Sequence, residues 1–284
     1  MEIPFDRDFT APFGVPQRLS PLVTRVLADN PGMFTFRGTG VYIVGAGRHV
    51  AVIDPGPDSK PHLAALKAVL DGKQVSHILI THTHADHSPA ARALKAWSGA
   101  RTFAFGPHPS RDTEEGPRVE ESSDRFFVPD ERLKDGERLD GDGFVLEALY
   151  TPGHISNHLC FALDQEKALF TGDHVMGWST TVVAPPEGDM TDYMHSLERL
   201  IAREDAILYP THGGPIRAPK NFLIAYRAHR LQREAAILDC VKRGVTTIPA
   251  IVEKLYVGVD RRLYPAAGRT VEAHLIKLKR ENKL

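Results

Sequence analysis

Cysteine is scarce in this sequence and long apolar runs are missing. Only Cys160 and Cys240 occur in 284 residues, which excludes a secreted fold stapled by several disulfides and favours a reducing compartment. No stretch approaches the roughly 18 consecutive apolar residues of a membrane helix. The first ten residues include Asp6, Arg7 and Asp8 and no apolar run, unlike a secretory signal. We therefore expect a cytoplasmic protein without a membrane partner.

A strong net charge is also missing, because the formal value is -1. The charge is nevertheless uneven. Residues 218–284 hold 14 Lys and Arg against 6 Asp and Glu, a balance of +8, and the remainder carries -9. A basic region of this kind suits a polyanion such as nucleic acid. Opposite charges also serve to dock two parts of one chain, so both interpretations stay open.

Hydrophobic patterning predicts strands mixed with helices as far as about residue 210. The expected strands are 41–44, 49–53, 77–81, 101–105, 144–150, 158–163, 167–171 and 206–209, and the expected helices are 60–70, 89–97 and 192–202. The proline-rich first 35 residues predict irregular chain that wraps a surface. The polar stretch 106–143 predicts a long surface excursion beside a cleft, with little regular structure.

Only helices are expected after residue 218, over 221–241, 248–255 and 270–279. The apolar runs before that point are too continuous for one-sided sheets. We therefore predict an α/β fold of two domains: a sandwich covered by helices over residues 1–217, and a small helical domain over residues 218–284.

Histidine and aspartate gather at the ends of predicted strands. Three histidines and one aspartate follow the strand that ends near residue 81, and three more candidates follow later strands, each beside a glycine that permits a tight turn. Imidazole and carboxylate together suit zinc or another borderline divalent metal. Two metal ions could be held if one carboxylate bridges them. The seven candidates are His82, His84, Asp86, His87, His154, Asp173 and His212.

With these motifs in this order, the chain resembles the metallo-β-lactamase superfamily over about residues 20–215. The resemblance implies an αββα sandwich with the site at one edge. The implied ligands are His82, His84 and His154 for a first metal, Asp86, His87 and His212 for a second, and Asp173 as the bridge. Asp54 matches an acidic position that orients the histidine loop in that family. From the sequence alone, Asp54 is equally typical of a turn before Pro55 and Gly56.

The segments 151–154, 177–181 and 193–197, together with the helical tail, resemble one subgroup more closely. Its members are β-lactamase-like proteins with a C-terminal winged-helix-like domain, and one branch cleaves single-stranded RNA. Asp173 stands where zinc β-lactamases usually place a cysteine, and His84 stands where flavodiiron proteins carry a glutamate. Both departures disfavour those two activities.

The ligand set predicts a dinuclear metal-dependent hydrolase. Two metals roughly 3.5–4 Å apart lower the pKa of a shared water and supply a bridging hydroxide near neutral pH. We expect Zn²⁺, with iron and manganese left open. Catalytic roles are assigned to Asp86, Asp173 and His158, and a ligand-supporting role to His174. For His158 and His174, a supporting group, a proton donor and an ordinary buried histidine remain alternatives. Residues 178–180 are expected to line the cleft.

The basic tail favours a phosphodiester of single-stranded RNA as the substrate, although the acidic stretch within 106–143 argues against it. The alternative is a thioester or ester hydrolase of the hydroxyacylglutathione hydrolase type, whose glutathione contacts are not identifiable here. Two further hypotheses are an iron-dependent sulfur oxygenase with the same ligands and a module that binds duplex DNA through its helical tail. The oligomeric state stays open.

Overall fold

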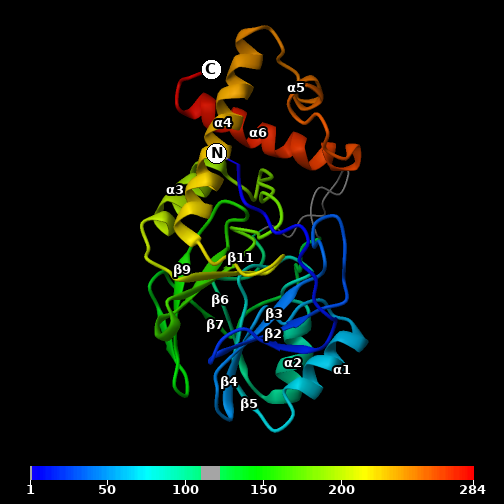
Figure 1. Cartoon of the computed structure of the whole chain (residues 1–284), viewed down its shortest axis with the longest axis vertical. Helices are drawn as coiled ribbons and strands as arrows, with labels where there is room; N and C mark the ends of the chain where they lie inside the picture. The colour runs from blue at the N-terminus through cyan, green and yellow to red at the C-terminus, as the bar shows by residue number, and fades with distance from the viewer. Residues whose placement is uncertain (1, 110–121) are drawn as a thin grey trace.

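Two stacked β-sheets form the body of the molecule in the computed structural model, which describes residues 2–109 and 122–284 (Figure 1). The larger sheet has the strand order β1-β2-β3-β4-β5-β6-β7, and the smaller one β12-β11-β10-β9-β8. The strands of the larger sheet are β1 (Pro16–Arg18), β2 (Val23–Leu27), β3 (Gly40–Val44), β4 (His49–Ile53), β5 (Gln74–Leu79), β6 (Arg101–Ala104) and β7 (Glu131–Arg132). Those of the smaller sheet are β8 (Arg138–Asp140), β9 (Val145–Tyr150), β10 (Leu159–Leu163), β11 (Ala168–Gly172) and β12 (Ile207–Pro210).

Apolar side chains fill the space between the sheets and beneath the helices on each outer face. Tyr42, Phe161 and Phe170 are fully buried between the sheets, and each side chain of this size contributes about 1.5–3 kcal/mol by leaving water. Helices α1 (Lys60–Val69) and α2 (Ala90–Ser98) cover the larger sheet, and α3 (Met190–Ile201) covers the smaller one. The predicted αββα sandwich is confirmed.

The chain after the sandwich is helical, as predicted, and consists of α4 (Pro219–Lys242), α5 (Ile248–Leu255), the short 3₁₀ turn η2 (Arg261–Leu263) and α6 (Tyr264–Arg280). Helix α4 belongs to two cores. Its first half packs Phe222 and Tyr226 against α3, and its second half packs Ile237 and Cys240 against α5 and α6. The boundary between residues 217 and 218 therefore stays a proposal, because α4 connects both parts.

Two expectations for regular structure need correction. The first 35 residues are not wholly irregular, because β1 and β2 form there and β2 buries Val23, Val26 and Leu27. Pro16 is tolerated because it opens an edge strand, where a missing N–H costs no ladder bond. Helix α6 begins six residues earlier than predicted. Pro265 is tolerated in its first turn, because the backbone N–H that proline lacks would have no partner within the helix there.

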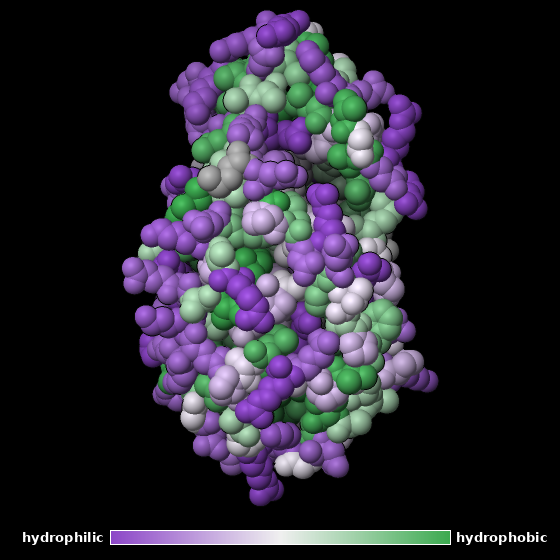
Figure 2. Space-filling view, in the orientation of Figure 1, coloured by the Kyte–Doolittle hydropathy of each residue, from purple (hydrophilic) through white to green (hydrophobic). Residues whose placement is uncertain are grey.

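The polar excursion lies partly outside the described residues, at 110–121. Its described parts contain only the short strands β7 and β8. Hydrophilic side chains cover much of the face seen in Figure 2, including the end formed by the C-terminal helices. Within residues 2–109 and 122–284, no helix has the length and apolar character needed to span a membrane.

Candidate metal centre

All seven predicted ligands lie at one end of the two sheets, in loops that follow strands. The loop after β5 carries four of them, and the loops after β9, β11 and β12 carry one each. Every one of these side chains belongs to a buried residue, with Asp173 the most exposed at 8%. Gly153, which precedes His154, has φ 135°, and a Cβ there would lie 2.2 Å from the Cα of Tyr193. Only glycine allows that turn.

The first cluster contains three imidazoles that converge on one point. His84 Nδ1 lies 2.9 Å from His82 Nε2 and 3.2 Å from His154 Nε2. Two ligands at 2.0–2.1 Å from a tetrahedral zinc ion would lie about 3.3 Å apart. The spacing of these nitrogens therefore fits a single metal ion.

The second cluster joins two carboxylates and two imidazoles. Asp86 Oδ2 lies 3.3 Å from His87 Nε2 and 3.0 Å from His212 Nε2. Asp173 Oδ1 lies 3.5 Å from the same nitrogen of His87 and 3.4 Å from that of His212. Asp173 also groups with His82 and His87 within ligand distance of one another, so its carboxylate lies between the two clusters, where a bridging ligand would have to be.

Asp54 lies behind the histidine loop. Its Oδ1 accepts the backbone N–H of Thr81 at 2.8 Å, and its Oδ2 accepts the Thr81 hydroxyl at 2.7 Å and His87 Nδ1–H at 2.8 Å. These bonds fix the start of the loop and keep a proton on His87 Nδ1, so that Nε2 is the nitrogen that gives up its proton when a metal binds. We propose that Asp54 orients the histidine loop through these contacts.

Other ligands are held in the same way from the side away from the site. His154 Nδ1 donates to the carbonyl of Val182 at 2.7 Å, and His212 Nδ1 donates to the carbonyl of Gly38 at 3.2 Å. In each case the bonded nitrogen carries a proton, so the opposite nitrogen is the one whose lone pair serves a metal when one binds.

The two clusters differ in charge. Burial lowers the pKa of His82 and of His84 well below the ordinary value, and neighbouring imidazoles lower both further. Burial acts in the same direction on His212, but Asp173 and Asp86 outweigh it and raise the pKa of His212 to about 10. Burial would raise the pKa of the Asp86 carboxyl, yet His87 and His212 keep that pKa well below its usual range. In the metal-free protein the first cluster is therefore neutral and the second is a set of ion pairs.

Several buried polar atoms at this site lack a hydrogen-bond partner and are available to a metal or to a water bound to it. Asp86 Oδ1, His87 Nε2 and Asp173 Oδ1 are fully buried, and none has a hydrogen-bond partner among the described residues. Buried polar atoms without partners are costly. Nitrogen and carboxylate donors in this number match zinc or a similar divalent ion. The residues present therefore fit two divalent metals, whose identity the geometry does not fix.

His158 and His174 lie behind the ligands and do not line the pocket. His158 Nδ1 lies 2.9 Å from the Thr151 hydroxyl, and its Nε2 accepts the backbone N–H of Asp173 at 3.2 Å. We therefore propose that His158 positions Asp173, and we no longer favour a direct catalytic role for it. His174 is fully buried, with its ring 4.5 Å from that of Tyr193. Its supporting role stays a prediction.

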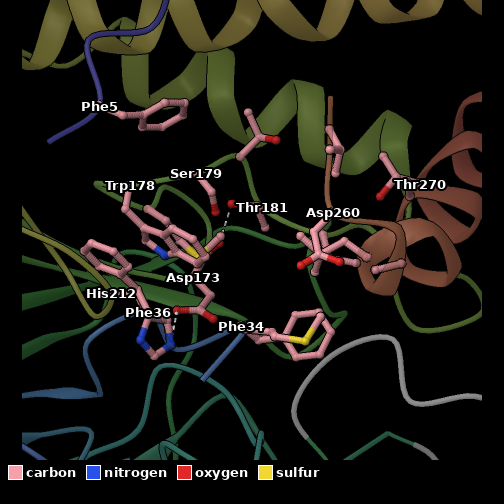
Figure 3. Close-up of a pocket in the computed structure, with 18 of the residues that line it drawn as sticks. Phe5, Phe34, Phe36, Asp173, Trp178, Ser179, Thr181, His212, Asp260 and Thr270 are labelled. Carbon is pink, nitrogen blue, oxygen red and sulfur yellow. Dashed lines mark hydrogen bonds and ion pairs between the residues drawn. The ribbon is translucent and has the colours of Figure 1, made fainter. Parts of the chain in front are cut away.

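A pocket of about 610 Å³ opens above the clusters, between the sandwich and the C-terminal helices. Its floor includes His84, His154, Asp173 and His212. Figure 3 shows Asp173 and His212 at one side of the pocket and Asp260 and Thr270 at the other. Most of the wall is apolar, with the rings of Phe36 and Trp178 stacked 4.8 Å apart. Residues 178–180 line it, as predicted.

Sequence reasoning missed the supporting hydroxyls and carbonyls. Thr39 donates to Asp86 at 3.3 Å, and Thr211 donates to Asp54 at 3.4 Å. Thr81 and Thr211 directly precede His82 and His212 in the sequence, and that repeated Thr-His pair was the available signal. The carbonyls of Gly38 and Val182 carry no signal, because every residue has a carbonyl.

Comparisons with known proteins match both parts of this chain. The model of the metallo-beta-lactamase superfamily matches residues 35–212, and that of the beta-lactamase associated winged helix domain matches residues 247–284. A beta-lactamase-like protein 2 homolog of Drosophila melanogaster is 32% identical over 277 residues, 94% of this chain and 91% of that protein. An atrochrysone carboxyl ACP thioesterase of Aspergillus chevalieri is 33% identical over 252 residues, 84% of this chain and 75% of that protein.

A solved beta-lactamase domain protein of Burkholderia ambifaria has the same fold, with a TM-score of 0.78 at 19% identity over 97% of this chain and 91% of that one. Among the relatives found by sequence, the matched part of this chain spans from 65% to 91% of the relative's own length. The fold and the His/Asp clusters define a metal-dependent hydrolase. The chain belongs to the metallo-beta-lactamase superfamily and carries a C-terminal winged-helix-type domain.

Proposed function

We propose that the protein hydrolyses thioesters of small apolar acyl groups. The pocket carries this proposal, because it is of the size that encloses a small organic molecule and its walls are mainly apolar, while the proposed ligands form its floor. The thioesterase named among the relatives supports the same chemistry. Phe36 and Trp178 would pack against the acyl group and keep bulk water away from the reacting carbon.

The ligands have separate tasks in this proposal. His82, His84 and His154 would hold one ion, Asp86, His87 and His212 the other, and Asp173 would contact both. Divalent ions held there supply polarisation of the substrate carbonyl and a lowered pKa for water. We expect zinc, and metal analysis of the purified protein distinguishes it from iron and manganese.

The chain itself handles the proton. Asp86 Oδ2 lies against His87 and His212 in the second cluster, whereas Asp86 Oδ1 has no hydrogen-bond partner in the described ranges. Oδ1 is therefore the oxygen that would accept the proton that water loses on attack. The new C–O bond forms at the acyl carbon, the C–S bond breaks, and the proton ends on the departing thiolate. Thr39 holds the other oxygen of Asp86 in place.

Single-stranded RNA, which the sequence analysis placed first, is the second candidate. Arg7, Arg230 and Arg233 line the pocket and would attract phosphate. However, Arg230 and Arg233 already donate to the carbonyls of Thr181 and Leu255. Other basic residues of the tail pair with acids, including Arg280 with Asp189 beside α3. Much of the tail's positive charge is therefore already paired, within the tail or with the sandwich.

A paired turnover assay tests the proposal. Zinc-loaded protein is offered a series of acyl thioesters of increasing chain length and, separately, a fluorescent single-stranded RNA. We expect thioester turnover that disappears in His82→Ala and persists in His49→Ala, a matched control because His49 is a half-exposed histidine remote from the site. RNA cleavage without thioester turnover would overturn the thioester proposal and establish the second candidate.

A further inference from the structure

The loop over residues 178–184 lies between the metal centre and the C-terminal helices. It follows β11 and the Asp173 turn, and it lines the pocket through Trp178, Ser179 and Thr181 (Figure 3). On one side it contacts two proposed metal ligands. On the other side it contacts α4 and α6. Its backbone therefore couples the C-terminal helices to the site.

On the metal side, the loop holds one ligand from each part of the centre. The Thr181 hydroxyl donates to the backbone carbonyl of Asp173 at 2.7 Å. The carbonyl of the next residue, Val182, accepts Nδ1–H of His154 at 2.7 Å. A shift of this loop would turn the Asp173 backbone and release the His154 ring together.

On the helical side, Tyr226 of α4 anchors the loop. Its hydroxyl oxygen accepts the backbone N–H of Thr181 at 2.8 Å and donates to the carbonyl of Ser179 at 3.1 Å. Arg230, one turn further along α4, donates to the Thr181 carbonyl. Thr270 of α6 accepts the backbone N–H of Val183 at 3.4 Å. The backbone of residues 179–183 thus makes four hydrogen bonds to side chains of α4 and α6.

The position of Tyr226 is itself well determined. The residue is fully buried, and its ring packs against Phe222 and Phe5 at centroid distances of 5.8 and 6.2 Å. A hydroxyl at the end of a packed ring has little freedom, so it fixes the atoms that it bonds. Hydrogen bonds that orient metal ligands from behind typically change metal affinity 10–100-fold when removed.

We propose that Tyr226 is a positioning residue for the metal centre, acting through Thr181 on Asp173 and through the adjoining carbonyl of Val182 on His154. The C-terminal helical region is then a structural part of the metal site as well as a wall of the pocket. This proposal rests on the metal ligand set proposed above, but it is independent of which substrate is hydrolysed.

Cobalt binding to the metal-free protein tests it without any substrate. The visible spectrum of bound Co²⁺ reports ligand geometry, and a competing chelator gives the affinity. Tyr226→Phe removes one oxygen and keeps the packed ring. We expect an altered cobalt spectrum and about tenfold weaker binding of at least one ion. Tyr264→Phe in α6 is the matched control, because its hydroxyl makes no hydrogen bond within the described residues, and it should match the wild type.

A conservative pair of variants separates positioning from folding. Thr181→Ser keeps both the N–H and the hydroxyl and should retain the wild-type spectrum, whereas Thr181→Val loses the bond to Asp173 and should reproduce the Tyr226→Phe spectrum. If Tyr226→Phe fails to fold, this pair still tests whether the loop positions the metal ligands. Wild-type spectrum and affinity in folded Tyr226→Phe, or in Thr181→Val, would overturn the positioning role alone. Failure of the wild type to bind cobalt would overturn the metal ligand set and this proposal with it.

Discussion

The substitution Asp54→Asn isolates the role of one buried carboxylate, because it replaces one oxygen by an NH₂ group and changes almost no volume. Asp54 Oδ1 accepts the Thr81 N–H, and Oδ2 accepts His87 Nδ1–H. An asparagine has only one acceptor oxygen. If that oxygen stays on the Thr81 N–H, the amide NH₂ faces His87 and forces its proton to Nε2, which is the nitrogen that the metal needs. If the amide flips, the Thr81 N–H is left buried against a donor.

Either orientation weakens the second metal cluster. Loss of an orienting partner costs about 10–100-fold in metal affinity, which corresponds to about 1.4–2.7 kcal/mol. The metal-free protein should also lose about 1.5–3 kcal/mol of unfolding free energy, because the lost bond involves a charged acceptor. Metal competition titrations and urea denaturation measure the two effects. Asp58→Asn is the control, since Asp58 is half-exposed and only 3.6 Å from Arg92 in a surface pair. Unchanged affinity of both ions in Asp54→Asn would refute the orienting role.

Three further predictions concern pH, metal removal and the pocket. The metal-free protein should be most stable near pH 6.5. Below that pH stability should fall, because the unfolded chain binds protons that folded His82 and His84, with their lowered pKa values, do not bind. Above it stability should also fall, because folded His212, with a pKa of about 10, keeps a proton that the unfolded chain has lost. Urea denaturation at about pH 5, 6.5 and 8.5 checks both slopes, and a stability that rises steadily across the range would contradict the charge assignment. Chelation should lower the midpoint of thermal unfolding, because a ligand that binds only the folded state stabilises it by mass action; an unchanged midpoint would argue against resident metal. Trp178→Ala removes the stack on Phe36 and should raise KM for apolar thioesters about tenfold with little change in kcat, whereas Trp97→Ala, at a half-exposed tryptophan on α2, should leave both constants unchanged.

The metal ligands were predictable because their signal is local. Each follows a predicted strand, and strand ends of a two-sheet sandwich meet at one edge, so seven side chains far apart in the chain could be expected together. Strand β2 was missed because the prolines around it outweighed its short apolar pattern of Val23, Val26 and Leu27. The role proposed for Tyr226 has no signal of its own, since its contact with Thr181 spans 45 residues and depends on how α4 docks.

The pocket was also only partly predictable from the sequence, because its walls come from distant segments of the chain. Trp178 could be predicted to line a cleft from its place after a strand near the ligands, but its partner Phe36 lies just after the segment predicted to be irregular and was given no role. The positive charge of the tail favoured nucleic acid as a partner. Only the structure shows that these basic side chains already form ion pairs, such as Arg280 with Asp189 and Lys277 with Glu234. The charge balance of a sequence gives the number of charged side chains, and it does not show which of them are already paired in the fold.

The most direct test of this account measures metal content and thioester turnover on the same samples. Metal-free protein is titrated with Zn²⁺, the bound metal is quantified after removal of the free ion, and the initial rate is recorded at each step. We expect saturation at two ions per chain, with turnover rising as they bind and no bound metal in a variant lacking His84 and Asp86. If the protein binds no zinc, or if turnover persists in the chelated protein, the two-metal hydrolase is contradicted.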